Sequence, residues 1–221
     1  MNMALEKWAR TGSLYGEWSR NCNRFALISN NLRRVRSLVW VEILWPTFGL
    51  QNEIPDEPVL FIKPNSALTE TITLPETSCR CEGELSFLIK NGALGAVAFG
   101  LDLTLGEVQN RLKAKGLPWE KAKAFNGSAA FSPFVTFDSQ AELQLELWLN
   151  GRLQQSGGVA LMIHKPAEIL TEIKRYFDLE DYDVVMTGTP SGVKELARGD
   201  RLHGMVKSGG RILVEREWLI G

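Results

Sequence analysis

The sequence is poor in histidine and cysteine, which limits the chemistry that it can support. Its 221 residues include only two histidines, His164 and His203, and three cysteines, Cys22, Cys79 and Cys81. A zinc site on the Cys79-x-Cys81 pair would need further histidine or cysteine ligands, which are scarce here. An odd number of cysteines with Cys-x-Cys spacing also argues against a disulfide framework. We interpret them as the reduced thiols of a cytoplasmic protein.

Long apolar runs and an excess of one charge are missing as well. No stretch approaches the roughly 20 apolar residues that span a bilayer, and residues 1–10 lack the apolar core of a secretion signal. The net charge of −1 and the pI of about 6.2 give no support for binding to nucleic acid or to a membrane surface. There is no internal repeat and no glycine-rich phosphate loop. We therefore expect a cytoplasmic protein with no nucleic-acid or membrane partner.

The sequence does carry a regular succession of strand, turn and helix patterns from about residue 50 onward. Asn91-Gly92 and Asn150-Gly151 are strong turn signals between apolar runs. Thr104-x-x-Glu107 has the spacing of a capping box that opens a helix, and Pro166 suits the start of another. The predicted strands are 84–89, 96–103, 142–149, 184–186 and 211–216. This pattern predicts a β-rich α+β domain over residues 50–221.

Residues 1–49 differ from the rest. They contain tryptophans mixed with arginines and show no sustained period of about 2 or 3.6 residues. We treat them as an atypical N-terminal segment.

Two glutamates and an aspartate are the candidate ligands of a metal ion. Side chains alternate along a strand, so Glu82 and Glu84 project to the same side, and Asp102 at the end of the next apolar run supplies a third carboxylate. Converging carboxylates repel one another unless a cation lies between them, and hard oxygen ligands favour Mg²⁺, Mn²⁺ or Ca²⁺ over zinc. For an isolated Glu-x-Glu pair, a solvated strand face is the more common explanation. From these residues alone, both readings stay open.

The neighbouring motifs decide between them. From about residue 50 to the C-terminus the sequence resembles the fumarylacetoacetate hydrolase family in its single-domain bacterial form. The order and spacing of several motifs make this resemblance specific. They are EPVLFIKP at 57–64, EGEL at 82–85, LDLT at 101–104, LPWEKAKAF at 117–125, NG at 150–151, MIH at 162–164 and TGTPSGV at 187–193.

The resemblance implies a rolled, mixed β-sheet, a homodimer, and a Mg²⁺ or Mn²⁺ cofactor bound by Glu82, Glu84 and Asp102. It gives Lys123 a catalytic role beside the metal, and it gives Gln155 and Thr189 roles in binding a small 2-oxo acid substrate. Without the resemblance, Lys123 would be taken for a surface lysine in a charged run, and Thr189 for part of a plain turn.

The reaction expected first is metal-dependent hydrolysis of a C–C bond in an acylpyruvate or fumarylpyruvate type of 2-oxo acid. A 2-oxo acid can chelate a divalent cation, which then stabilises the enolate formed when a bond is cleaved or a proton moves. Isomerisation, hydration or decarboxylation of a related dicarbonyl acid such as oxaloacetate is the alternative. A further alternative is that the protein is a catalytically impaired remnant of the family.

The sequence departs from the family pattern at three places. Cys79, Arg80 and Cys81 stand where family members usually carry a histidine before the Glu-x-Glu pair, and Asn126 replaces a usual aspartate. Residues 1–49 contain no histidine and nothing that resembles the family's Gly-Arg-Asn-Tyr strand end or the His–Glu pair that activates water.

A shifted reading frame would explain the last departure. If residues 39–47 are reverse-translated and read from the third base of each codon, Trp40-Val41 forces glycine and Trp45-Pro46 forces alanine. Codons for arginine and asparagine can follow the glycine, and a histidine codon can stand six positions after it. This is the family's Gly-Arg-Asn…His spacing. We hypothesise that the segment before about residue 50 is read out of frame.

Overall fold

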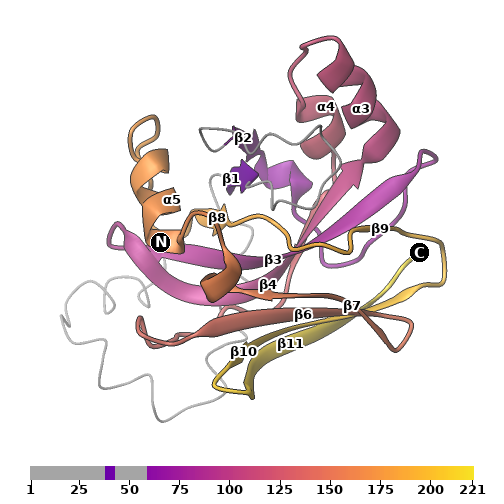
Figure 1. Cartoon of the computed structure of the whole chain (residues 1–221). Coiled ribbons are helices and arrows are strands. Elements are labelled where there is room, and N and C mark those ends of the chain that lie inside the picture. Colours follow the sequence, from indigo (N-terminus) through magenta and orange to yellow (C-terminus); the bar gives the residue numbers. More distant parts are fainter. Residues whose placement is uncertain (1–37, 43–58) are drawn as a thin grey trace, which may run out of the picture.

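The computed structural model describes residues 38–42, as a backbone strand, and residues 59–221. Within these residues two β-sheets pack face to face, and helices lie at the margins of the larger sheet (Figure 1). The larger sheet has the order β2-β1-β8-β3-β4-β5, with β9 paired to β3, and the smaller has the order β11-β10-β6-β7.

The element bounds are as follows. The larger sheet contains β1 (Leu38–Glu42), β2 (Val59–Lys63), β3 (Cys79–Lys90), β4 (Ala93–Leu105), β5 (Ala129–Phe131), β8 (Val184–Met186) and β9 (Lys194–Glu195). The smaller contains β6 (Leu143–Leu149), β7 (Arg152–Gly158), β10 (Arg201–Ser208) and β11 (Arg211–Leu219). The helices are α3 (Gly106–Ala114), α4 (Glu120–Lys123) and α5 (Pro166–Ile173), with 3₁₀ turns at Asn65–Ala67 and Val159–Leu161.

The larger sheet is mixed. β1 runs parallel to β8, whereas β1–β2, β3–β8 and β3–β4 are antiparallel. The predicted β-rich α+β class with a mixed sheet is therefore confirmed.

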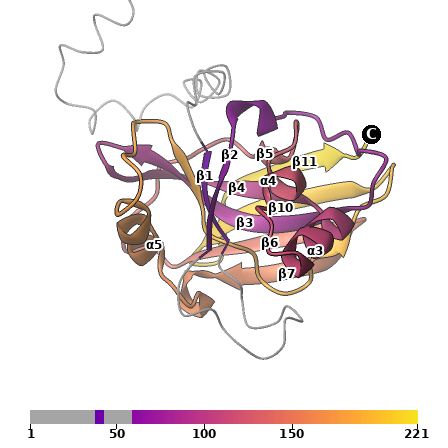
Figure 2. The ribbon, with the colours of Figure 1, turned by 90° about the horizontal axis from the view of Figure 1, so that it is seen from above.

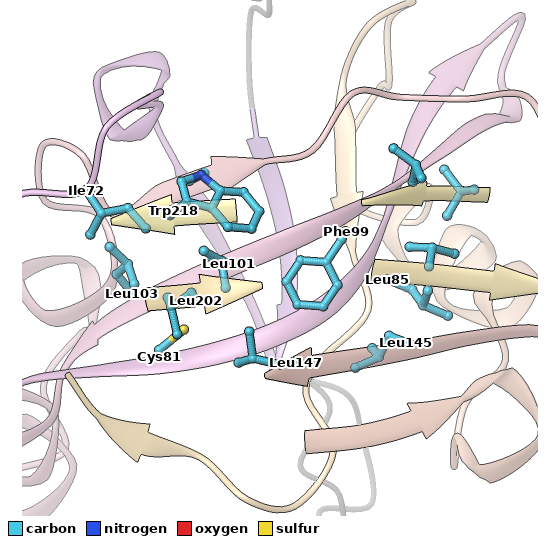
Figure 3. Packing of buried hydrophobic residues seen from close by; sticks show 14 of the residues in the cluster. Ile72, Cys81, Leu85, Phe99, Leu101, Leu103, Leu145, Leu147, Leu202 and Trp218 are labelled. Carbon is cyan, nitrogen blue, oxygen red and sulfur yellow. The ribbon is translucent and has the colours of Figure 1, made fainter. Parts of the chain in front are cut away.

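The main core fills the space between the two sheets (Figure 3). Phe99 of β4 is fully buried at its centre, and its ring centroid lies 6.2 Å from that of Trp218 on β11. Leu145 and Leu147 of β6 and Leu202 of β10 pack around it. One face of the β3–β4 hairpin packs against this core. The side chains on its other face are therefore available for a functional site.

The β3–β4 hairpin is longer than the sequence predicted. Asn91 and Gly92 have φ values of 51° and 71° and form the expected tight turn. Most residues of both strands are buried, whichever side they face. Alternation between polar and apolar residues therefore fades toward the strand ends, and this is why the predicted bounds were too short.

One expected helix start is wrong and another is confirmed. Thr104 does not cap α3, because β4 continues through Leu105 and the helix begins at Gly106 with no side-chain cap. The capping-box spacing here belongs to a strand end. Pro166 does open α5, and the carboxylate of Glu168 accepts a hydrogen bond from the backbone N–H of Lys165 at 2.8 Å.

The N-terminal segment contributes one strand that the sequence did not predict. β1 is a Leu-Val-Trp-Val-Glu run rich in residues that favour strands, and it lies between β2 and β8. The other residues of the segment lie outside the described part of the chain. No helix among the described residues is long and apolar enough to cross a membrane.

Candidate metal centre

The register of the β3–β4 hairpin brings the three predicted carboxylates together. Glu82 lies directly opposite Asp102, and Glu84 is two residues further along β3 on the same face. All three side chains are buried, and one oxygen of each lies within 4.8 Å of an oxygen of the others. The solvated-face explanation of Glu82 and Glu84 is therefore excluded.

Lys123 is buried against these carboxylates. It is the last residue of α4, which packs beside β4 and β2 (Figure 2). Its Nζ donates to Glu82 Oε2 at 2.7 Å and to Asp102 Oδ2 at 2.6 Å. The Ser128 hydroxyl donates to the Lys123 carbonyl at 2.8 Å and fixes the end of this short helix. Lys123 is thus not the surface lysine that its charged neighbours indicate.

The strand β2 supplies a second buried lysine, which sequence reasoning missed. Phe61 and Lys63 alternate with the exposed Ile62, so both point inward. Lys63 Nζ lies 2.8 Å from Asp102 Oδ1, and the Phe61 ring centroid lies 5.4 Å from Lys123 Nζ. The alternation in Val59–Lys63 was the available signal, because it places a lysine on the inward face of a short strand.

Thr189 lies at the Glu84 end of the site. The neighbouring backbone N–H of Gly188 donates to Glu84 Oε2 at 2.7 Å. The Thr189 hydroxyl is half-buried and donates to the carbonyl oxygen of Gly83 at 2.9 Å. The turn at Gly188 and Thr189 therefore fixes the carboxylate of Glu84 and places the Thr189 hydroxyl close to β3.

Gln155 approaches β3 from the opposite face. A Cβ at Gly83 would meet Gln155 Oε1 at 3.2 Å, and side chains of adjacent strand residues point to opposite faces. Its amide group accepts from the Gly83 N–H at 2.9 Å and donates to Thr189 Oγ1 and to the Pro190 carbonyl, both at 2.8 Å. Gln155 therefore influences the carboxylate site indirectly, because its hydrogen bond fixes the position of Thr189.

Burial and neighbouring charges move the carboxyl pKa values in different directions. Burial raises the pKa of Glu84 well above its usual range, and the nearby Asp102 and Glu82 raise it further. Burial also raises the pKa of Asp102 to about 6, although Lys123 and Lys63 oppose this. Burial would raise the pKa of Glu82 too, but Lys123 and Arg80 outweigh it and lower that pKa. When all groups are ionised, the three carboxylates carry more negative charge than the two lysine ammoniums neutralise.

Arg80 and the two cysteines flank the carboxylates on β3. Arg80 Nη2 donates to Gln109 Oε1 of α3 at 2.9 Å. Burial raises the pKa of Cys79 to about 11 and that of Cys81 well above the usual thiol range. Both therefore stay protonated thiols at neutral pH in the metal-free protein.

This donor set fits a hard divalent cation. Three buried carboxylates and two buried ammonium groups leave one net negative charge when all are ionised. A buried group of like charges is costly without a counter-ion, and oxygen ligands suit Mg²⁺ and Mn²⁺. Glu82, Glu84 and Asp102 are the residues that would hold it.

Comparison with known proteins identifies the family. The model for the fumarylacetoacetate (FAA) hydrolase C-terminal domain matches residues 46–217. The chain belongs to the fumarylacetoacetate hydrolase family. It is 40% identical over 172 residues to an oxaloacetate tautomerase of Escherichia coli, which covers 68% of this chain and 78% of the relative.

Solved structures of this family share the fold. A candidate fumarylacetoacetate isomerase/hydrolase from Oleispira antarctica superposes with a TM-score of 0.80 at 30% identity, over 85% of this chain and 94% of that one. A fumarylpyruvate hydrolase from Pseudomonas aeruginosa, crystallised with Mn²⁺ and pyruvate, gives a TM-score of 0.73 at 27% identity, over 84% and 89% of the two chains.

Proposed function

We propose that this family member is a Mg²⁺- or Mn²⁺-dependent enzyme that interconverts the enol and keto forms of an oxaloacetate-like 2-oxo acid. The observation that supports this most strongly is the buried ammonium of Lys123 against Glu82 and Asp102, inside a cluster that can hold a divalent ion. The similarity to an oxaloacetate tautomerase at 40% identity supports the same reaction.

The chemistry follows from the arrangement of charges. A divalent ion, when bound, polarises the 2-oxo group and stabilises the enolate. Lys123 adds a fixed positive charge and an N–H donor beside the substrate oxygens, in a buried place where charges interact more strongly than in water. The Gly188 N–H holds the Glu84 carboxylate in place. The Thr189 hydroxyl lies beside it and donates to the Gly83 carbonyl, so it can bind a substrate carboxylate only by turning away from that carbonyl. Tautomerisation moves one proton between carbon and oxygen and requires no activated water.

Hydrolysis of an acylpyruvate, which the sequence led us to expect first, is the second candidate. The structural similarity to a fumarylpyruvate hydrolase favours it. Hydrolysis needs a base that activates water. Within residues 59–221, His203 pairs with Glu215 on the β10–β11 hairpin and His164 precedes α5. Among residues 59–221, neither histidine forms a hydrogen bond or ion pair with the carboxylate cluster, so tautomerisation is the better supported reaction.

The test uses matched lysine variants in α4. Enol-oxaloacetate is supplied with Mn²⁺, and the loss of the enol's ultraviolet absorbance is followed. Lys123→Met should lower kcat by about 10²–10³-fold, the usual effect of removing a buried group that stabilises developing charge. Lys121→Met removes the same charge from the exposed face of the same helix and should behave as the wild type. Full activity in Lys123→Met would refute the assignment.

Parallel assays separate the reactions. Acetylpyruvate and fumarylpyruvate report hydrolysis, and pyruvate release from oxaloacetate reports decarboxylation. Glu84→Gln should abolish both Mn²⁺ binding and turnover; if it changes neither, the metal site is wrongly assigned. A folded protein that binds Mn²⁺ but turns over none of these substrates would identify a family remnant.

A further inference from the structure

The ammonium of Lys63 is fixed in place by three oxygen atoms. Its Nζ lies 2.8 Å from Asp102 Oδ1, 2.8 Å from the Ser128 carbonyl oxygen and 3.2 Å from the Leu103 carbonyl oxygen. The side chain is fully buried. A lysine ammonium has three N–H donors and no acceptor. Two of these three oxygens belong to main-chain carbonyls, which cannot rotate away as side chains can. Lys63 is therefore a fixed positive charge at one oxygen of Asp102.

The two oxygens of Asp102 have different surroundings. Oδ1 lies against Lys63, which reaches it from β2. Oδ2 lies against Lys123, which also contacts Glu82 Oε2. Glu82 is the cross-strand partner of Asp102, so Oδ2 is on the side where the carboxylates converge. Oδ1 is on the side of β2 and is engaged by a charge that does not belong to the converging group.

How many oxygens a carboxylate offers bears on which cation a site prefers. Ca²⁺ takes six to eight oxygens and accepts bidentate carboxylates, whereas Mg²⁺ requires a compact octahedron and takes single oxygens. Each oxygen of Asp102 faces an ammonium, but the two ammoniums are held differently. Lys123 is hydrogen-bonded to the Glu82 and Asp102 carboxylates, which a cation would itself engage. Lys63, in contrast, is held at Oδ1 by two main-chain carbonyls. A cation can therefore replace the Lys123 contact at Oδ2 but not the Lys63 contact at Oδ1. The extra oxygen that Ca²⁺ could use is then withheld.

We propose that Lys63 is a positioning residue that keeps Asp102 a one-oxygen ligand and so makes the site selective for a small octahedral cation over Ca²⁺. This inference rests on the metal site of the proposed function. It assigns to Lys63 a task different from that of Lys123: Lys63 determines which ion the site accepts, whereas Lys123 faces the substrate side.

A simpler role for Lys63 is that of a clamp between β2 and the β4–β5 strands. A clamp would affect stability and would leave the preference between cations unchanged. A purely electrostatic role would change the affinity for Mg²⁺ and Ca²⁺ by the same factor. The ratio of the two affinities therefore separates selection by ligand geometry from both of these roles.

The experiment measures that ratio in the full chain. Mn²⁺ bound to the protein is followed by electron paramagnetic resonance and displaced with Mg²⁺ or Ca²⁺. In Lys63→Met, the Ca²⁺ affinity relative to Mg²⁺ should rise by about tenfold, because Asp102 can then offer both oxygens. Lys121→Met, an exposed control with the same change of charge, should keep the wild-type ratio. Lys63→Arg, which retains a charged donor, should restore it at least in part.

Each outcome has a distinct meaning. A folded Lys63→Met with the wild-type ratio overturns the inference and leaves the metal site intact. Wild-type protein that binds no Mn²⁺ refutes the proposed function itself. If Lys63→Met does not fold, infrared spectra of wild-type protein with ¹³C-carboxyl aspartate supply the test. Loading with Mg²⁺ should then produce the wide carboxylate band splitting of one-oxygen coordination, and a narrow bidentate splitting overturns the inference.

Discussion

Asp102 is the residue on which the charges of the site converge. An ammonium lies within 2.8 Å of each of its oxygens, yet burial still raises its pKa to about 6 from an ordinary value of 3.8. The folded protein without metal therefore binds this proton more tightly than the unfolded chain does. Metal binding has the opposite requirement, since a cation binds the ionised carboxylate. Proton and metal compete for the same oxygen atoms.

This competition predicts a change of sign in the pH dependence of stability. With a chelator present, Asp102 should lower the free energy of unfolding as pH rises from about 4 to about 6, by up to about 3 kcal/mol. Saturating Mn²⁺ should reverse the slope. Urea unfolding at several pH values measures it, and Asp102→Asn provides the non-titrating reference. A chelated wild type that gains stability over this range relative to Asp102→Asn would contradict the pKa assignment.

Gln155 shows how a buried amide can act through a neighbour. Its three hydrogen bonds join Gly83 of β3 to Thr189 and the following residue. Gln155→Leu should lower the free energy of unfolding by about 2–3 kcal/mol, since buried donors and acceptors lose their partners. Denaturant titration measures this. Gln154→Leu, which removes a single bond to Gly192, should cost about 1 kcal/mol or less; equal losses in both variants would argue against the bridging role.

Among the elements, β4 and β10 approach each other very closely within the core. A Cβ at Gly204 of β10 would lie 2.2 Å from ring carbons of Phe99, which is fully buried. Gly204→Ala should therefore destabilise the protein by about 2–3 kcal/mol through overpacking.

A double-mutant cycle checks the cause. Phe99→Leu makes room at the same place, so the double variant with Gly204→Ala should be more stable than the sum of the two single losses predicts. Simple additivity, measured by thermal or chemical unfolding, would show that the ring is not what opposes the methyl group.

The elements also show what could be predicted from the sequence. Strands with one solvated face, such as Leu143–Leu149, were predicted to within a residue, because alternation and the Asn150-Gly151 turn agree. The long strand β4 was predicted too short, and Thr104 was assigned to a helix start, because burial on both faces removes the alternation on which such predictions depend. The strand at Leu38–Glu42 was not predicted, although its residues favour strands, because the surrounding segment shows no hydrophobic periodicity.

The sequence brought together the residues of the candidate site, with one exception. Glu82, Glu84, Asp102 and Lys123 lie together as the family resemblance implied. The metal-binding role of the three carboxylates stays a prediction, as do the roles of Lys123, Gln155 and Thr189. Lys63 was missed because its partners, Asp102 and the Ser128 carbonyl, are brought to it only by the pairing of β4 with β5. Neither the composition nor the spacing of motifs in the sequence predicts such a contact.

At the scale of the whole molecule, the N-terminal segment raises a question for the gene. We expect that resequencing codons 1–55 will show, in the offset frame, a histidine codon six positions after the glycine codon formed by Trp40-Val41. Absence of that codon disproves the frame-shift hypothesis. A restored frame should add hydrolysis of acylpyruvates to the activities of the protein, because it would supply the family's water-activating pair.

The homodimer implied by the resemblance remains a proposal for the intact protein. Light scattering after size-exclusion chromatography should give twice the chain mass of 24.7 kDa. A mass equal to one chain at micromolar concentration would refute it.

The position of β1 has a consequence for biosynthesis. β2, which carries Phe61 and Lys63, joins the larger sheet through β1, and β1 pairs in parallel with β8 near the other end of the chain. On the ribosome, the first of these strands therefore emerges long before its partner is translated. A nascent chain truncated before residue 184 lacks the strand that pairs with β1 and the Gly188 N–H that holds Glu84, so it cannot assemble a complete site.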